Sequence, residues 1–348
     1  MKKKILTIIL SVVMILSITS CKKEEKDVVY VYNWGEYIDE SLLRDFENET
    51  GIKVVYEVFE QNEDMYMKLK NGGSNYDVVV PSDYMIERMI SEDMLDEIDK
   101  EKIPNLKNIT EEFLNEDYDP EGKYSIPYLW GTVGIVYNSK LVDEEVDSWD
   151  ILWNEKYKDE IIMMNSTRDS IGISLIKNNY SMNSRNIDEL NKAKEDLIKQ
   201  KPLVFAYLVD ETKSQMVNGE AKLAVMYSGD ALTAMDENED LRYVVPKEGS
   251  NIWFDSMCIP KGAKNKENAE KFINYILRPE VSAAIGEYVG YSLPNKEGIK
   301  LLPEEMQNNE VAYPDLKKLP KMEVFKDPKD INPIYDDIWA EVKLSKYD

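Results

Sequence analysis

Apolar strand-like runs and amphipathic helix-like stretches alternate along residues 28–90, and this order constrains the fold more than any other feature of the chain. The expected strands are 28–33, 52–59 and 77–80, and the expected helices are 39–49, 65–70 and 84–90. Asp39 is a capping residue at the start of the first helix, and Gly51 ends it. This order predicts mostly parallel strands with helices on the faces of the sheet. In such sheets, ligands bind at the carboxyl ends of the strands.

Two long apolar runs, 125–138 and 252–259, are suited to strands that cross from one lobe to another. Between and after them the alternation continues. We expect strands at 161–164, 203–208, 223–227 and 242–245, and helices at 188–199, 212–218, 268–277, 280–288 and 334–344. A chain of 348 residues can form two domains. The sequence therefore predicts an α/β fold whose N-terminal lobe comprises 28–131 and 254–305 and whose C-terminal lobe comprises 132–253 and 306–348.

The N-terminus has the features of an export signal. Three lysines at positions 2–4 precede an apolar run, 5–18, that is too short for a comfortable membrane span. The run ends in Ile18-Thr19-Ser20-Cys21, which resembles a bacterial lipobox. We expect residues 1–20 to be removed, Cys21 to carry a lipid and residues 21–27 to form a tether. The mature protein is then anchored to the outer face of the cell membrane, on the periplasmic side in a Gram-negative cell.

Charge and missing residue types exclude several functions. The leader carries three lysines and no acidic residue, so its removal takes the formal net charge from −24 to −27. Such a chain repels nucleic acid and attracts cations. It contains no histidine, which excludes Ser-His-Asp and Cys-His catalysis and histidine-ligated zinc. With Cys21 lipidated, Cys258 is the single remaining cysteine, so we expect a buried thiol and no intramolecular disulfide.

Two groups of residues with the chemistry for an organic cation follow strands of the predicted sheet. The run Asn33-Trp34-Gly35-Glu36-Tyr37 follows the first strand, and Ser82 and Tyr84 follow the third. Aromatic faces and a carboxylate together suit an organic cation. An ordinary strand-end loop with a packed Trp has the same composition, so this run alone leaves both interpretations open.

The second long strand repeats the pairing of a ring with an acid. Trp253 and Asp255 lie two residues apart and share one face of the strand. An acid buried beside Trp253 needs a partner that neutralises it. Further polar clusters follow strands at 165–170 and 227–230, and Tyr291 lies in a Gly-Tyr-Ser-Leu-Pro run. Residues 165–170 alone are typical of a helix-capping loop.

Six runs carry a family resemblance: NWGEY, ETGIKVVYE, YDVVVPSDY, YSIPYLWGTVGIVYN, VVPKEGSNIWFDSMCIP and GYSLPN. In this order and spacing, they resemble the spermidine/putrescine-binding component of bacterial polyamine ABC transporters over essentially the whole mature chain. The resemblance implies a two-lobed type II periplasmic-binding-protein fold that closes on its ligand, with the two crossing strands as hinge. It also implies a monomer without catalysis, cofactor or metal, which delivers its polyamine to permease subunits.

Carried over by position, the resemblance implies a set of ligand-binding residues: Trp34, Glu36, Tyr37, Ser82, Tyr84, Ser166, Asp169, Tyr227, Trp253, Asp255 and Tyr291. Asp255 would hold an ammonium group, and Trp253 would stack along the methylenes. The chain departs from the family at three positions. Ser166 stands where the family often has an acid, Tyr227 replaces a second Trp, and Phe325 takes the place of a glutamine. The choice between spermidine and putrescine therefore stays open.

Two alternatives also fit the residues. An exported glycoside hydrolase would use Asp255 and Asp169 as paired carboxylates, and turnover of a glycoside would identify it. A carrier of ferric iron or another cation would use Tyr84, Tyr227 and Tyr291, and a coloured holo form would identify ferric iron.

Overall fold

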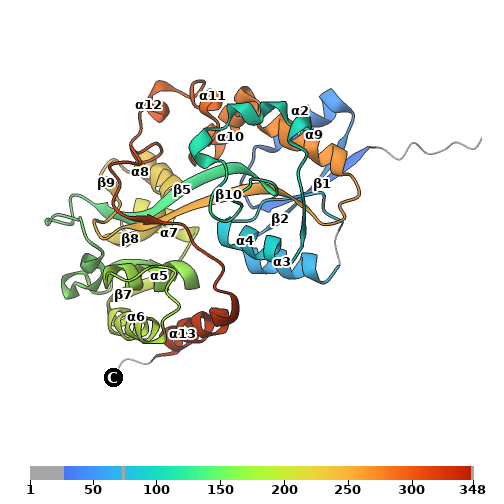
Figure 1. The fold of residues 1–348 in the computed structure, drawn as a ribbon. Coiled ribbons are helices and arrows are strands. Elements are labelled where there is room, and N and C mark those ends of the chain that lie inside the picture. The colour runs from blue at the N-terminus through green and yellow to red at the C-terminus, as the bar shows by residue number, and fades with distance from the viewer. Residues whose placement is uncertain (1–26, 73–74, 346–348) are drawn as a thin grey trace, which may run out of the picture.

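The computed structural model describes residues 27–72 and 75–345, so the expected leader, Cys21 and nearly all of the tether lie outside it. The path of neighbouring strands is β2-β1-β3-β10-β5-β8-β6-β7, with β4 and β11 on β10 and β9 on β5 (Figure 1). The strands are β1 Val28–Trp34, β2 Lys53–Phe59, β3 Val78–Val79, β4 Leu95–Asp96, β5 Ser125–Asn138, β6 Ile161–Met164, β7 Val204–Leu208, β8 Leu223–Tyr227, β9 Leu241–Val244, β10 Ser250–Pro260 and β11 Met322–Glu323.

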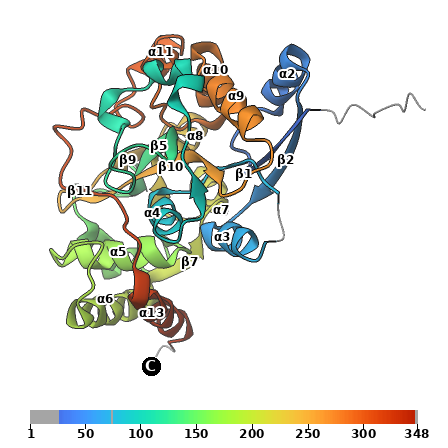
Figure 2. The same cartoon turned by 45° about the vertical axis from the view of Figure 1, so that its right-hand side comes forward.

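Helices cover both faces of this sheet, which confirms the predicted α/β class (Figures 1 and 2). They are α2 Glu40–Thr50, α3 Asn62–Lys70, α4 Asp83–Ser91, α5 Thr167–Lys177, α6 Ile187–Gln200, α7 Glu211–Val217, α8 Ser228–Glu237, α9 Lys266–Ile276, α10 Pro279–Val289, α11 Lys296–Ile299, α12 Glu304–Gln307 and α13 Asn332–Leu344. Asp39 caps α2 and Gly51 ends it in the left-handed region, as predicted. Among the described helices, none is both long and apolar enough to cross a bilayer.

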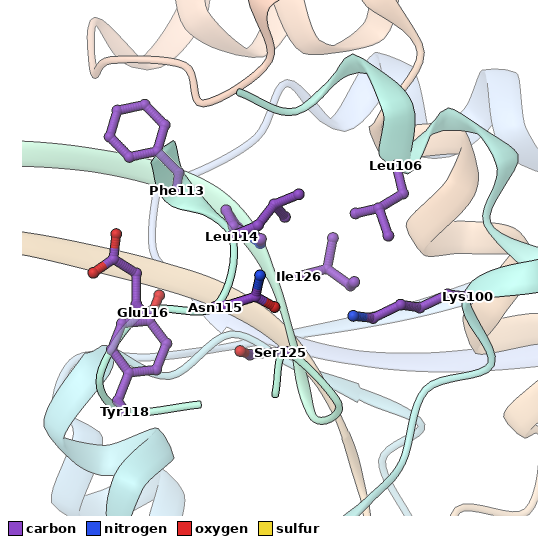
Figure 3. A pocket seen from close by; sticks show the side chains of 11 residues that line it. Lys100, Leu106, Phe113, Leu114, Asn115, Glu116, Tyr118, Ser125 and Ile126 are labelled. Carbon is purple, nitrogen blue, oxygen red and sulfur yellow. The ribbon is translucent and has the colours of Figure 1, made fainter. Parts of the chain in front are cut away.

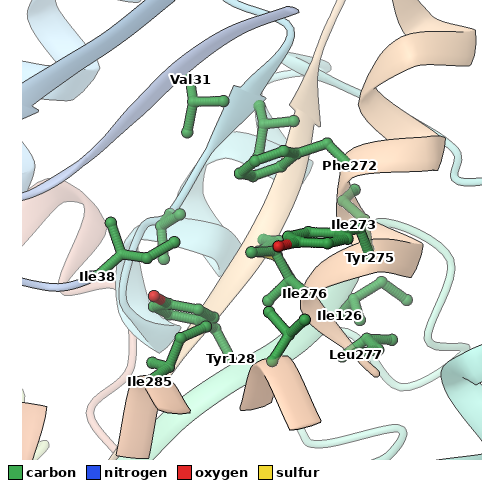
Figure 4. Close-up of a cluster of buried hydrophobic side chains, with 14 of the residues drawn as sticks. Val31, Ile38, Ile126, Tyr128, Phe272, Ile273, Tyr275, Ile276, Leu277 and Ile285 are labelled. Atoms are coloured by element: carbon green, nitrogen blue, oxygen red, sulfur yellow. The ribbon is translucent and has the colours of Figure 1, made fainter. Parts of the chain in front are cut away.

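The N-terminal lobe is built around β1, which runs parallel to β2 on one side and to β3 on the other. Residues 100–127 form short 3-10 turns and the start of β5 at its surface, where a pocket of about 10 Å³ has room for a single water (Figure 3). Helix α9 turns Phe272 and Ile276 into one core with Ile126 of β5 (Figure 4). Each Å² of apolar area that such side chains bury stabilises the fold by about 25 cal/mol. Burial of this kind is the main favourable contribution to folding.

The C-terminal lobe is built around β6, which runs parallel to β7 and β8. Along the strands of this lobe, successive residues pack into different hydrophobic cores, one on each face of the sheet. Ile135 and Val225 pack toward α5, whereas Val136 and Ala224 pack toward α7 and α8. Because both faces are covered, the strands are apolar throughout rather than alternating.

Strands β5 and β10 belong to both lobes. The first part of β5, Ser125 to Thr132, pairs antiparallel with β10, and the part from Val133 onward pairs with β8 and β9. The two predicted crossing strands are therefore present. The lobe boundaries and the hinge at this crossing stay predictions.

Gly131 lies at the crossing, opposite Trp253. A Cβ at this position would lie 2.6 Å from the Trp253 ring and 2.8 Å from the Ser228 hydroxyl. We expect Gly131→Ala to lower the free energy of unfolding by about 1–3 kcal/mol because the overpacked ring must move. Urea unfolding measures the change. Gly35→Ala is the control because nothing lies within 4 Å of its Cβ position. Equal stability of the two variants would contradict the expectation.

Candidate functional site

Asp255 of β10 is a buried carboxylate, and no cationic side chain among the described residues pairs with it. Its Oδ2 accepts the Tyr37 hydroxyl at 2.6 Å, and its Oδ1 accepts the Ser82 hydroxyl at 2.6 Å. Burial raises its pKa to about 6, and the bonds from Ser82 and Tyr37 lower the pKa in part. The side chain is 4% exposed. A carboxylate has about four acceptor positions, so this group can also accept the N–H donors of an ammonium.

On the opposite lobe, Asp169 accepts hydrogen bonds from the same types of residue as Asp255. It lies in the first turn of α5, where the Ser166 side chain caps the helix by accepting from the Asp169 N–H. Its Oδ2 accepts the hydroxyls of Ser166 and Tyr227, the latter at 3.1 Å. Burial raises the pKa of Asp169 above its usual value, while these two hydroxyls and the nearby Arg168 lower it in part. Each acid thus accepts from one serine and one tyrosine.

Four rings connect the two acids. In order, they are Tyr37, Tyr291, Trp253 and Tyr227, and we call them the aromatic row. Successive centroids are 5.8, 5.1 and 5.9 Å apart, with interplanar angles of 65°, 84° and 79°. The two end rings donate to Asp255 and Asp169. A row of apolar ring faces with a carboxylate at each end matches a chain of methylenes with a cation at each end.

A polar network holds the N-terminal end of the aromatic row. The Asn62 amide donates to the Ser82 hydroxyl at 3.1 Å and to the Tyr84 hydroxyl at 3.2 Å, and it accepts the Ser82 N–H. Tyr84 in turn donates to Glu63 at 3.0 Å. Asp83 accepts the Phe254 N–H at 3.1 Å and so ties the start of α4 to β10. Ser82 is thereby fixed opposite Asp255.

A family model described as bacterial extracellular solute-binding protein matches residues 41–314. A spermidine/putrescine-binding periplasmic protein of Salmonella typhimurium is 38% identical over 95% of this chain and 96% of its own length. The chain belongs to the bacterial extracellular solute-binding protein family.

Two solved structures are similar to this solute-binding protein. One is the substrate-binding protein of a spermidine/putrescine ABC transporter from Streptococcus pneumoniae, 44% identical, with a TM-score of 0.80 over 91% of this chain and 99% of that one. The other is a lipoprotein of Treponema pallidum, 29% identical, with a TM-score of 0.81 over the same shares of the two chains. They confirm the predicted two-lobed type II periplasmic-binding-protein fold.

The structure does not bring every predicted residue of this solute-binding protein to the aromatic row. Trp34 is half-buried, and its ring centroid lies 4.5 Å from that of Phe59. Its buried indole N–H has no hydrogen-bond partner among the described residues. Glu36 is exposed and has a φ of 52°. Tyr84 packs against the core that contains Trp253, and its hydroxyl bonds to Asn62 and Glu63 rather than to Asp255 or Asp169. A role for these three in binding stays a prediction.

Two residues that bond to side chains of the site were not predicted. Asn62 was missed because it lies 20 residues before Ser82 and carries no motif. Asp230 accepts the Tyr291 hydroxyl at 2.8 Å, and the Tyr291 ring lies against Gly229, where a Cβ would approach within 2.2 Å. Asp230 belongs to the polar cluster 227–230 at a strand end, and this cluster was the sequence signal for it.

The two alternatives gain no support. The hydroxyls of Tyr84, Tyr227 and Tyr291 bond to three different carboxylates, so they do not converge on one ion. Within residues 27–72 and 75–345, no group of three or more Cys, Asp or Glu side chains is arranged to hold a metal. The family binds solutes, and its relatives give no basis for a hydrolase.

Proposed function

We propose that this protein binds a polyamine outside the cytoplasm and delivers it to the permease of an ABC transporter, without catalysis. The aromatic row with Asp255 and Asp169 at its ends carries the proposal. The similarity to the spermidine/putrescine-binding proteins of Salmonella and Streptococcus supports it.

The energetics of a diamine fit this geometry. Taking an ammonium out of water costs several kcal/mol unless a carboxylate compensates it, so each end of the ligand needs an acid. A desolvated cation–π contact adds about 2 kcal/mol. Micromolar affinity needs only about −8 kcal/mol in total, which two acid contacts and the rings can supply.

The proposed location follows from the sequence before residue 27. Cleavage at the lipobox would leave Cys21 as the lipid-bearing first residue, and the similar Treponema protein is itself a lipoprotein. A Cys21→Ser variant should be released into the medium or the periplasm, whereas the native protein should fractionate with membranes. Membrane association of the variant would contradict the lipid anchor.

Thermal shift tests the binding. Millimolar putrescine or spermidine should raise the Tm by several degrees, because a ligand at 1,000 times its Kd adds about 4 kcal/mol of stability. Trp253 lies in the aromatic row, so its fluorescence should change with the same midpoint. A diol of the same length, 1,4-butanediol, is the control because it lacks both charges. No shift with any of a panel of amines would overturn the proposed function.

A further inference from the structure

The guanidinium of Arg168 is buried next to Asp169. Arg168, the residue before Asp169 on α5, is 9% exposed. Its guanidinium carbon lies 4.8 Å from the Phe325 ring centroid and 4.9 Å from that of Tyr335. It donates to the Lys326 carbonyl at 3.1 Å and to the Asn183 side chain at 3.0 Å. A positive charge is therefore fixed where α5 meets the C-terminal segment that runs from β11 to α13 (Figure 2).

Phe325 fills the space beside this guanidinium. The ring is 5% exposed and belongs to the core of the C-terminal lobe. A Cβ added to Gly172 of α5 would lie 3.3 Å from the Phe325 ring, so helix and ring are in close contact. We call Arg168 and Phe325 the plug. The plug packs directly against α5, in the turn that carries Asp169.

The acids near the aromatic row, other than Asp255 and Asp169, are already engaged or exposed. Each oxygen of Asp83 accepts a backbone N–H, from Tyr84 at 2.7 Å and from Phe254 at 3.1 Å. Asp230 accepts the Tyr291 hydroxyl. Glu36 at the other end is exposed, and an exposed ion pair contributes little to affinity.

Within residues 27–72 and 75–345, no acid forms an ion pair with Arg168 of the plug. Ser166 offers only a hydroxyl, and its hydrogen is already donated to Asp169. The Tyr84 ring from the opposite lobe lies 5.9 Å from the Arg168 guanidinium carbon, so this boundary closes across both lobes. A third ammonium at this end would face a like charge and an apolar ring.

Resting on the proposed function, we propose that the site selects a linear diamine over a triamine. One ammonium lies at Asp255, the other at Asp169, and the plug ends the site. Putrescine satisfies both acids, whereas the additional aminopropyl group of spermidine must face the plug or extend into water beside Glu36. The native protein should bind putrescine at least tenfold more tightly than spermidine.

Calorimetric titration of the purified protein with both amines tests this selectivity. Ser166→Asp is the main variant because Asp is also a good helix-capping residue and the change adds an acid next to the plug. It should improve the affinity for spermidine relative to putrescine at least tenfold. Thr110→Asp is the matched control, since it adds one negative charge at the start of another helical turn in the other lobe. It should leave the ratio unchanged.

A second variant opens the plug directly. Phe325→Ala should also move the ratio toward spermidine, and Phe205→Ala, at an exposed phenylalanine of the same lobe, is its control. Circular dichroism checks that both fold. Spermidine binding as tight as putrescine in the native protein, or a Ser166→Asp variant that changes both affinities equally, would overturn the selectivity alone. Binding of neither amine would overturn the proposed function and the selectivity with it.

Discussion

Replacing Asp255 with asparagine is expected to weaken putrescine binding at least a hundredfold while the protein stays folded. Asparagine has nearly the same shape, so the contacts with Tyr37 and Ser82 keep their packing. The negative charge is lost, and a buried ammonium without its partner costs about 3–5 kcal/mol. At 1.4 kcal/mol per factor of ten, this corresponds to a loss of at least a hundredfold.

Calorimetry with putrescine measures the loss. Asp330→Asn is the control because it removes the same charge from an exposed side chain in a surface ion pair with Arg185. The unliganded Asp255→Asn variant should be at least as stable as the native protein at pH 7, because the native charge is buried without a cation. Binding within threefold of the native value would show that Asp255 does not hold an ammonium.

Acidification is expected to weaken binding by a comparable factor. The pKa of Asp255 is raised to about 6, chiefly by burial, and an ammonium binds only the ionised form. Affinity should therefore change little between pH 8 and pH 7, fall about tenfold by pH 5 and about a hundredfold by pH 4. The pKa of Asp169 is also raised by burial, which adds to the loss. Titrations in buffers of different ionisation enthalpy should also detect proton release on binding below pH 6.

The stability of the unliganded protein should respond with the opposite sign. Because the folded-state pKa of Asp255 lies above its unfolded value, the folded state binds more protons between about pH 4 and 6. This group therefore destabilises the fold at pH 7, and that cost decreases as the pH falls from about 6 to about 4. Thermal unfolding of native protein and Asp255→Asn across this range isolates the contribution. In the binding titrations, an affinity for putrescine that does not change between about pH 7 and pH 4 would contradict the raised pKa of Asp255.

The strand ends and their chemistry could be predicted from sequence because they depend on local rules. Period two placed Trp253 and Asp255 on one face, and both are buried as expected. The parallel order placed the ends of β1 and β3 at one edge, where Tyr37 and Ser82 bond to the same carboxylate. Segment limits agree with the prediction to within a few residues for most elements.

Helix α5 was not predicted, for a physical reason. From Arg168 to Ile176, every residue of α5 is buried, so the helix has no polar stripe from which a period of 3.6 could be recognised. The plug was missed for a different reason. The stacking of Arg168 on Phe325 joins residues 157 positions apart, and no local pattern indicates such a contact.

The antiparallel pairing of β10 with both β3 and β5 sets an order of events during synthesis. The N-terminal lobe begins at residue 28, but β10, the strand that joins β3 to β5, starts only at residue 250, and α9 and α10 come later still. Until about three-quarters of the chain has left the ribosome, β3 and the first part of β5 lack their shared neighbour. The core of the N-terminal lobe therefore cannot be completed before β10 has been synthesised.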